Sequence, residues 1–136
     1  MLENERYYLE EDKKDMVKMD EIRTSGDYFA ICDNGRAYYA QYSTAYERMF
    51  FCIPKDVEIL GYIPVKEIKT LKYIRRDSHS RPIYQDADGM LWKDMDSRRG
   101  RQGPLYAIDA NNINSEPLFP LKLNIRCNFI PGRAVD

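Results

Sequence analysis

Apolar and polar residues alternate strictly near the C-terminus, between positions 121 and 129. The apolar members are Leu121, Leu123, Ile125, Cys127 and Phe129, and the polar members are Lys122, Asn124, Arg126 and Asn128. Because successive side chains of a β-strand point to opposite faces, this period of two predicts a half-buried strand with all its apolar residues on the core side. A shorter β-prone run, residues 106–108, predicts another strand before it.

The strongest hairpin signal lies nearer the N-terminus, where two β-prone runs, 28–32 and 36–42, flank the Asp-Asn-Gly tripeptide at 33–35. An Asn-Gly pair readily takes the positive φ angles of a type I′ turn, whose twist matches that of the strands. Such a two-residue turn places Ile31 opposite Tyr38. Both faces of the hairpin then carry apolar side chains, which predicts a central position in a sheet.

A second hairpin is predicted over residues 82–94, where two β-prone runs flank an Ala-Asp-Gly turn. A two-residue loop sets Trp92 opposite Gln85, whereas a three-residue loop sets it opposite Tyr84. The pattern permits both registers.

Two short helices are also predicted. Residues 6–23 are highly charged, and the spacing of their few apolar positions fits an amphipathic helix. Residues 45–52 predict a second helix, because Thr44 and Glu47 have the spacing of a capping box and Pro54 stands where a helix would end.

The sequence therefore predicts an α+β fold, with a predominantly antiparallel, curved sheet or partly open small barrel and one or two short helices. Residues 57–63 predict a further strand, and 66–72 fit either a helical turn or a strand. One domain is expected over 1–136, with a charged N-terminal helix in 1–23, a β-rich core in 24–130 and a tail in 131–136.

With 136 residues, the chain has the length of one typical domain and can bury a sizeable core. It carries 21 basic and 22 acidic side chains, for a net charge of -1. A nearly neutral chain has no general attraction to nucleic acid or to an anionic membrane, so electrostatic recognition must depend on a local cluster.

The number and spacing of the cysteines favour a cytoplasmic location for the protein. Cys32, Cys52 and Cys127 are odd in number, lack paired spacing and stand among apolar neighbours, which predicts buried free thiols. The N-terminus has neither the basic nor the apolar region of a secretion signal. No apolar run approaches the roughly 20 residues that a membrane helix requires, so no membrane association is expected.

Two arginine clusters flank the second hairpin: Arg75, Arg76, Arg81, Arg98, Arg99 and Arg101. A hairpin brings its two ends together, so we expect the clusters to meet in space whichever register is correct. Planar guanidinium groups present paired donors that suit phosphate. Tyr84 and Trp92 lie close in sequence and would offer the stacking surface that single-stranded nucleic acid uses.

The alternative is that these arginines are solvated loop residues. Asp77, Asp94 and Asp96 are close enough in sequence to neutralise much of the cluster, and Tyr84 and Trp92 would then pack in the core. Pairing between these carboxylates and the arginines decides between the two interpretations.

Other site chemistries fit the sequence poorly, and no metal, cofactor or catalytic residue is assigned. The Asp-Ala-Asp-Gly segment at 86–89 resembles part of a calcium loop, but the first and last ligand positions would be Tyr84 and Met95. His79 is the sole histidine, so a zinc site with several histidines is impossible. A small hydrolase centred on His79 stays open as a third hypothesis.

The leading hypothesis is a non-enzymatic intracellular binding protein whose arginines contact a phosphate-rich ligand, RNA or single-stranded DNA. The runner-up is a protein-protein interaction module, an inhibitor or adaptor, that uses the tyrosine-rich hairpin 28–42 and charged faces, since tyrosine and arginine dominate interface hot spots. Whether the chain forms homo-oligomers is left open.

Overall fold

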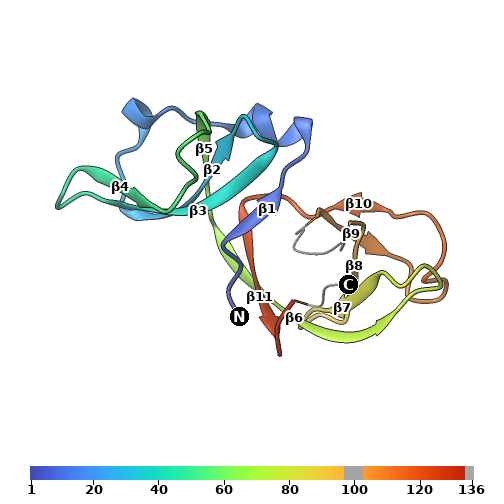
Figure 1. The fold of residues 1–136 in the computed structure, drawn as a ribbon. Helices are drawn as coiled ribbons and strands as arrows, with labels where there is room; N and C mark the ends of the chain where they lie inside the picture. The colour runs from blue at the N-terminus through green and yellow to red at the C-terminus, as the bar shows by residue number, and fades with distance from the viewer. Residues whose placement is uncertain (97–102, 134–136) are drawn as a thin grey trace.

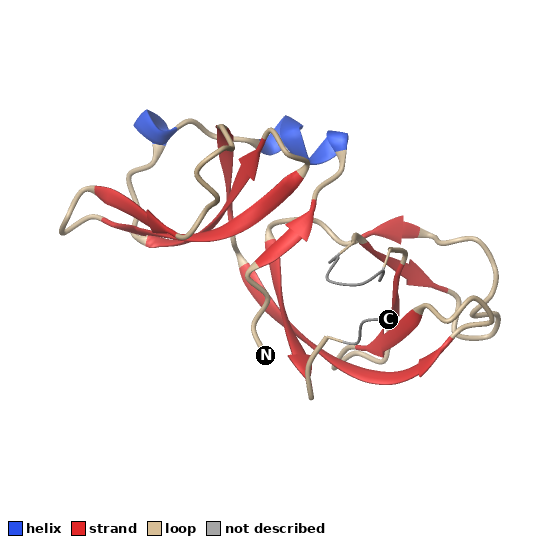
Figure 2. Cartoon of the chain, in the orientation of Figure 1, coloured by secondary structure: helices blue, strands red, loops and turns tan. Residues whose placement is uncertain are grey.

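The computed structural model describes residues 1–96 and 103–133. The described residues are mostly β, with 47% of them in strands and 7% helical. The strands form two sheets, one of which curls into a half-barrel (Figures 1 and 2). The predicted α+β class is therefore wrong, whereas the expectation of curved, antiparallel-rich sheets in one small domain is confirmed. No helix within the described ranges is long and apolar enough to cross a membrane.

The N-terminal sheet contains β1 (Glu5–Tyr7), β2 (Gly26–Cys32), β3 (Arg36–Ser43), β4 (Arg48–Phe51) and β5 (Ile59–Pro64). Its centre is the hairpin of β2 and β3, with β5 beside β2. The outer edge of β3 pairs with β1 over one part of its length and with β4 over another. All these pairings are antiparallel.

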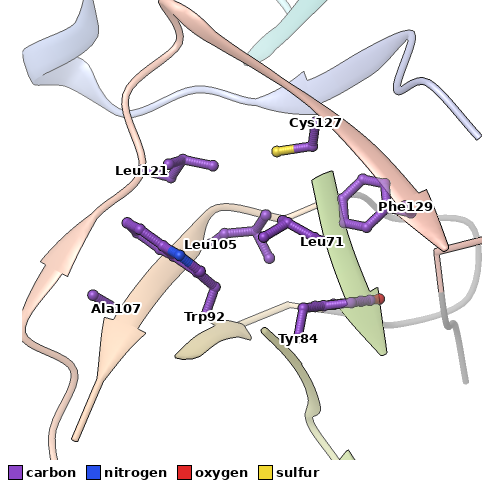
Figure 3. Close-up of a cluster of buried hydrophobic side chains, with 8 residues drawn as sticks. All are labelled: Leu71, Tyr84, Trp92, Leu105, Ala107, Leu121, Cys127 and Phe129. Atoms are coloured by element: carbon purple, nitrogen blue, oxygen red, sulfur yellow. The ribbon is translucent and has the colours of Figure 1, made fainter. Parts of the chain in front are cut away.

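The half-barrel contains β6 (Glu67–Arg76), β7 (Pro82–Gln85), β8 (Leu91–Asp94), β9 (Leu105–Ile108), β10 (Phe119–Pro120) and β11 (Ile125–Ile130). Strands β6 to β10 follow one another as an antiparallel meander, and β11 pairs with β6 in parallel. The core shown in Figure 3 is formed by Leu71, Tyr84, Trp92, Leu105, Ala107, Leu121, Cys127 and Phe129.

Two segments pass from one sheet to the other. The first residues of the chain run along β11, where the Phe129 amide donates to the Met1 carbonyl at 2.9 Å, before β1 joins the N-terminal sheet. Between β5 and β6, the Lys66 amide donates to the Asn124 carbonyl at 2.7 Å. Leu123 also packs in the cluster that contains Phe29 of β2, so the two sheets share apolar contacts.

The first predicted helix, 6–23, is wrong. It is replaced by β1 and by two 3-10 helices, η1 (Glu10–Asp15) and η2 (Met19–Glu21), neither of which buries a residue. Between them, Val17 exchanges backbone hydrogen bonds of 2.8 and 2.9 Å with Tyr62 of β5. A helix here would have only a few apolar residues to bury, whereas the extended segment at Val17 makes two backbone hydrogen bonds with β5.

The second predicted helix, 45–52, is also wrong, because the chain makes a turn there and continues as β4. Glu47, the expected capping-box partner, has a φ of 53°, which lies outside the helical region. Strand β4 pairs with residues 40–43 of β3. Pairing with an existing strand offers a full set of backbone hydrogen bonds, whereas a short isolated helix is marginal in water.

Both predicted hairpins exist, and both close with three-residue loops. In the first, Ile31 faces Ala37 rather than Tyr38, so the predicted register is wrong by one residue. Gly35 supplies the left-handed residue, with a φ of 83°. The hairpin is nevertheless central and apolar on both faces, as expected. In the second, Trp92 faces Tyr84, which selects one of the two registers left open.

The alternating segment at 121–129 is confirmed only in part. Strand β11 begins at Ile125, and the residues before it form a turn. Leu121, Leu123, Cys127 and Phe129 are buried as expected, but so is Arg126, which is 6% exposed. The guanidinium of Arg126 lies over the ring of Tyr39 in β3, 3.6 Å from the ring centroid, so this part of the polar face of β11 is covered.

Candidate functional site

The first arginine cluster surrounds the tight turn between β6 and β7. Arg75 and Arg76 end β6, where they pair with Ile83 and Pro82 of β7. The turn is closed by a 3.0 Å hydrogen bond from the Asp77 amide to the Arg81 carbonyl. Arg75 is exposed, and Arg76 and Arg81 are partly exposed. The three arginines are therefore brought together at one end of the half-barrel.

Asp77, the acid inside this cluster, points into the protein. Its Oδ1 accepts the amides of His79 and Arg81, each at 2.8 Å. Its Oδ2 lies 2.8 Å from Nζ of Lys93, whose side chain is 3% exposed. Burial alone would raise the pKa of Asp77, but Lys93 and the two amides hold the pKa below its usual range. The carboxylate is thus ionised and paired with Lys93.

The second cluster, Arg98, Arg99 and Arg101, lies outside the described residues. The residues that flank it are described: the Gly103 amide donates to the Asp96 carbonyl at 3.2 Å. A Cβ at Gly103 would lie 2.7 Å from that carbonyl oxygen, so this close approach requires glycine. Because β6 to β9 are antiparallel, the end of β8, the start of β9 and the β6–β7 turn lie at the same end of the half-barrel.

Asp94, a second acid near the clusters, is also committed elsewhere. Its Oδ2 lies 2.5 Å from Nη2 of Arg133, and both side chains are almost fully buried. Nη2 of Arg133 also donates to the Gly103 carbonyl at 2.8 Å. The carboxylates of Asp77 and Asp94 therefore form ion pairs with Lys93 and Arg133.

Tyr84 and Trp92, predicted as stacking residues, lie in the core of the half-barrel (Figure 3). Tyr84 is fully buried and packs edge-on against Phe129, with ring centroids 5.1 Å apart. Trp92 is 4% exposed, and its indole N–H donates to Asp86 at 3.0 Å. In this arrangement neither ring is accessible to a ligand, and core packing accounts for both.

A buried ionic cluster that was not predicted from the sequence connects the N-terminal residues to β11. Arg6 is 2% exposed; it pairs with Glu3 and donates to the carbonyls of Lys122 and Ile125 at 3.2 and 2.6 Å. Glu3 in turn accepts the Cys127 amide at 3.0 Å. Every partner is internal, so this cluster is structural rather than a ligand site.

The tyrosine-rich hairpin of the runner-up hypothesis is mostly covered. Tyr28, Tyr38 and Tyr42 are less than 10% exposed. The exposed aromatic side chains lie instead on the neighbouring β3–β4 projection, with Tyr46 at 73% and Phe50 at 44%. An apolar groove of about 770 Å³ runs between this projection and β1. This region could not be identified from sequence, because 45–52 was expected to form a helix.

His79, the centre of the third hypothesis, is exposed in the β6–β7 turn and lies beside the Ser78 hydroxyl at 3.3 Å. Among the described residues, no group of three His, Cys, Asp or Glu side chains is arranged to hold a metal ion.

Comparison with known proteins gives no relative: no family model, no curated protein and no solved structure matches this chain.

Proposed function

We propose that the chain is a non-enzymatic binding protein that contacts the phosphates of RNA or single-stranded DNA through its arginines. The surface consists of Arg75, Arg76 and Arg81, together with Arg98, Arg99 and Arg101 of the β8–β9 connection. The observation that carries the proposal is the 2.8 Å ion pair between Asp77 and Lys93. It pairs the acid inside the first cluster with Lys93, so Asp77 does not compete with a phosphate for Arg75 and Arg81.

The burial of Tyr84 and Trp92 narrows the proposed mode of binding. Because these two rings are buried, they offer the bases nothing to stack on, and we expect the contacts to be made chiefly to the phosphate backbone. Phosphate contacts position a nucleic acid but carry no sequence information. The proposed interaction is therefore indifferent to sequence and strongly dependent on salt.

The proposed compartment is the cytoplasm. Cys32, Cys52 and Cys127 are free thiols; Cys32 and Cys127 are buried as predicted, whereas Cys52 is exposed, so its predicted burial is wrong. Burial raises the pKa of the Cys32 thiol to about 11, which keeps it protonated and unreactive. Three unpaired cysteines in one small domain support a reducing environment.

Fluorescence anisotropy with a labelled single-stranded oligonucleotide tests the proposal. At low salt, we expect binding by the wild type and at least about tenfold weaker binding by Arg75→Gln/Arg81→Gln and by Arg98→Gln/Arg99→Gln, because each charge-assisted contact contributes about 1.5–3 kcal/mol. Arg23→Gln/Arg48→Gln removes the same charge from exposed arginines of the N-terminal sheet and should bind like the wild type. Equal binding by all four proteins would refute the proposal.

A second candidate function, a protein-protein interaction module, is favoured by the exposed Tyr46 and Phe50 beside the apolar groove. Pulldown from a cell extract treated with nuclease separates the two candidates. A protein partner that survives nuclease and is lost with Tyr46→Ser/Phe50→Ser supports the module. Loss of all captured material on nuclease treatment supports the nucleic-acid proposal.

A further inference from the structure

The outer face of the half-barrel is covered over β7, β8 and β9. Gln85 pairs with Lys72 of β6 on one side and with Leu91 of β8 on the other, and cross-strand partners share one face of a sheet. Ile83, two residues before Gln85, belongs to the same face. Ile83 and Leu91 are buried there with Ile113 of the β9–β10 connection, in a cluster separate from the core. The chain thus supplies its own second layer over this part of the sheet.

On β6 the same face is exposed. Leu71 belongs to the core cluster and Tyr73 packs against it, so Lys72 between them points outward. Ile68, another outward position, is 52% exposed. Ile74, at the bulge in β6, is 40% exposed. Two isoleucines and a lysine of one strand are therefore open to solvent.

Strand β11 continues this exposed face beside β6 (Figure 1). Ile130 pairs with Lys72 and is 45% exposed. The isoleucines Ile68, Ile74 and Ile130 thus lie on two neighbouring strands. Single exposed apolar residues are normal on a protein surface, whereas several together mark an interaction surface.

The charge of this face has one sign. Its outward positions on β6 and β11 include Lys72 but no Asp or Glu. Arg75 pairs with Ile83, which places it on the same face. Among the described residues, no carboxylate forms an ion pair with Lys72 or Arg75. The complementary surface of a partner is therefore apolar, with acidic groups beside the apolar part.

The backbone around these residues determines which kind of segment can cover them. Both edges of β6 are paired, with β7 and with β11. The outer edge of β11 is occupied by the first residues of the chain, through the 2.9 Å hydrogen bond from the Glu3 amide to the Cys127 carbonyl. An extended segment laid on the face would bury its own amides and carbonyls without partners. A helix satisfies its backbone internally, so a helix fits this face.

We propose that the outer face of β6 and β11 binds an amphipathic helix of another protein, whose apolar stripe packs on Ile68, Ile74 and Ile130. Acidic residues beside the stripe lie against Lys72 and Arg75. The distance from Ile68 to Ile74 along the strand is about 20 Å, which a helix of about 13 residues spans. This interaction is separate from the nucleic-acid contact, because bases stack on aromatic rings rather than on isoleucine.

Backbone-amide NMR spectra recorded with a synthetic peptide test the proposal. The probe is an amphipathic peptide of about 16 residues with leucines along one helical face and glutamates beside them. Its matched control has lysine in place of every glutamate. We expect the glutamate peptide to shift the signals of β6 and β11 and to bind at least about tenfold more tightly than the lysine peptide. Absence of shifts at millimolar peptide, equal binding of both peptides, or shifts confined to β3 and β4 would overturn the proposal.

Two double variants locate the apolar contact. Ile68→Ser/Ile74→Ser removes two exposed isoleucines and should weaken binding of the glutamate peptide at least about tenfold. Met19→Ser/Leu118→Ser makes the same kind of change at exposed residues elsewhere and should bind like the wild type. Thermal unfolding curves confirm that both variants fold. Equal binding by the two variants would refute the assignment.

A second pair of variants tests the charge. Lys72→Gln should weaken binding of the glutamate peptide about twofold to fivefold, as expected for an exposed ion pair. Lys55→Gln removes the same charge from an exposed turn elsewhere and should leave binding unchanged. If both lysine variants bind like the wild type, charge plays no part in recognition and the proposal fails.

Other occupants of this face give different results. The oligonucleotide that tests the arginine surface should bind Ile68→Ser/Ile74→Ser as it binds the wild type. A loss of oligonucleotide binding in this variant would assign the face to nucleic acid. Sedimentation equilibrium tests for a second copy of the chain, because a dimer that is lost in the same variant would assign the face to self-association. Either result would overturn the proposal of a helix.

Discussion

The two sheets of this chain are stabilised in different ways. In the N-terminal sheet, the central hairpin buries apolar side chains on both faces: Tyr28 and Ala30 belong to one cluster, and Phe29 and Ile31 to another. In the half-barrel, an apolar core is accompanied by buried charges at the strand ends. The N-terminal sheet is thus a layer between two apolar clusters, whereas the half-barrel depends also on internal ion pairs.

Three aspartates of the meander, Asp77, Asp86 and Asp94, form the same kind of arrangement. Each accepts at least one backbone amide from the turn that follows it. Each also contacts a basic side chain from elsewhere in the chain, and the partners are Lys93, Lys69 and Arg133. One carboxylate therefore closes a turn and also joins it to another strand. Buried charge here specifies turns and register, which apolar packing alone specifies less well.

The largest effect is expected from Arg6→Met, in the ionic cluster that joins β1 of the N-terminal sheet to β11 of the half-barrel. The change removes a buried cation and leaves Glu3 and the carbonyls of Lys122 and Ile125 without their donor. We expect a loss of about 3–5 kcal/mol in the free energy of unfolding, measured by urea denaturation, because breaking a buried pair is strongly destabilising and Arg133, 3.8 Å from Glu3, compensates the remaining charge only in part. A loss below about 1 kcal/mol would show that the ionic cluster does not stabilise the junction.

The elements that sequence predicted correctly are those in which side-chain period and turn chemistry agree. The two hairpins and β5 (Ile59–Pro64), which was predicted over 57–63, follow this rule. The first hairpin's register failed by one residue because Gly35 closes a three-residue loop, and an Asn-Gly pair is compatible with both loop lengths. Sequence period cannot reveal loop length.

The ionic residues could not be predicted from sequence. Arg6 and Arg126 stand at positions that local polarity assigns to solvent, and both are buried because the other sheet covers them. Likewise, Asp77 was expected to neutralise its arginine neighbours, but its partner, Lys93, is two strands away in the meander. A charged residue becomes internal through tertiary contacts, and those contacts have no local sequence signature.

A second, smaller effect is expected from Asp86→Asn. Burial by itself would raise the pKa of Asp86, but the Trp92 indole, the Met90 amide and Lys69 hold the pKa below its usual range. Loss of the charge should cost about 1.5–3 kcal/mol at neutral pH, as for other hydrogen bonds to charged groups.

The pH dependence of the free energy of unfolding tests whether the charge of Asp86 is responsible for this effect. Because the folded-state pKa is depressed, the contribution of Asp86 is present above the unfolded-state pKa of about 3.9 and is lost as pH falls through the folded-state value. Urea denaturation across this range should therefore show a smaller acid-induced loss in the variant than in the wild type. If the free energy of unfolding falls equally with pH in the two proteins, the charge of Asp86 does not stabilise the fold.

Ile31→Val tests the contribution of apolar packing in the N-terminal sheet, for comparison with the charged Asp86 of the half-barrel. Ile31 is fully buried between Phe29 and Leu123, so removal of one methylene should cost about 0.5–1.5 kcal/mol. No titratable group changes, and the difference from wild type should be the same at neutral pH and in acid. If urea denaturation instead gives a strongly pH-dependent difference, the contrast between the sheets does not hold.

The smallest effect is expected from Glu5→Gln, which breaks an ion pair at the surface of the N-terminal sheet. Glu5 lies 2.5 Å from Arg36, and both side chains are about 30% exposed. Arg36 keeps its hydrogen bond to Tyr7 at 2.8 Å, so the loss should be only about 0.2–1 kcal/mol.

Salt should weaken the exposed pair of Glu5 and Arg36 more than the buried pair of Arg6 and Glu3. At about 1 M salt the Debye length is about 3 Å, so screening should remove most of the effect of Glu5→Gln while the buried pair of Arg6 and Glu3 stays largely unscreened. Urea denaturation of both variants at low and high salt measures the difference. Salt sensitivity in Arg6→Met and none in Glu5→Gln would reverse the comparison, because the charges that matter to the fold would then be those that water reaches.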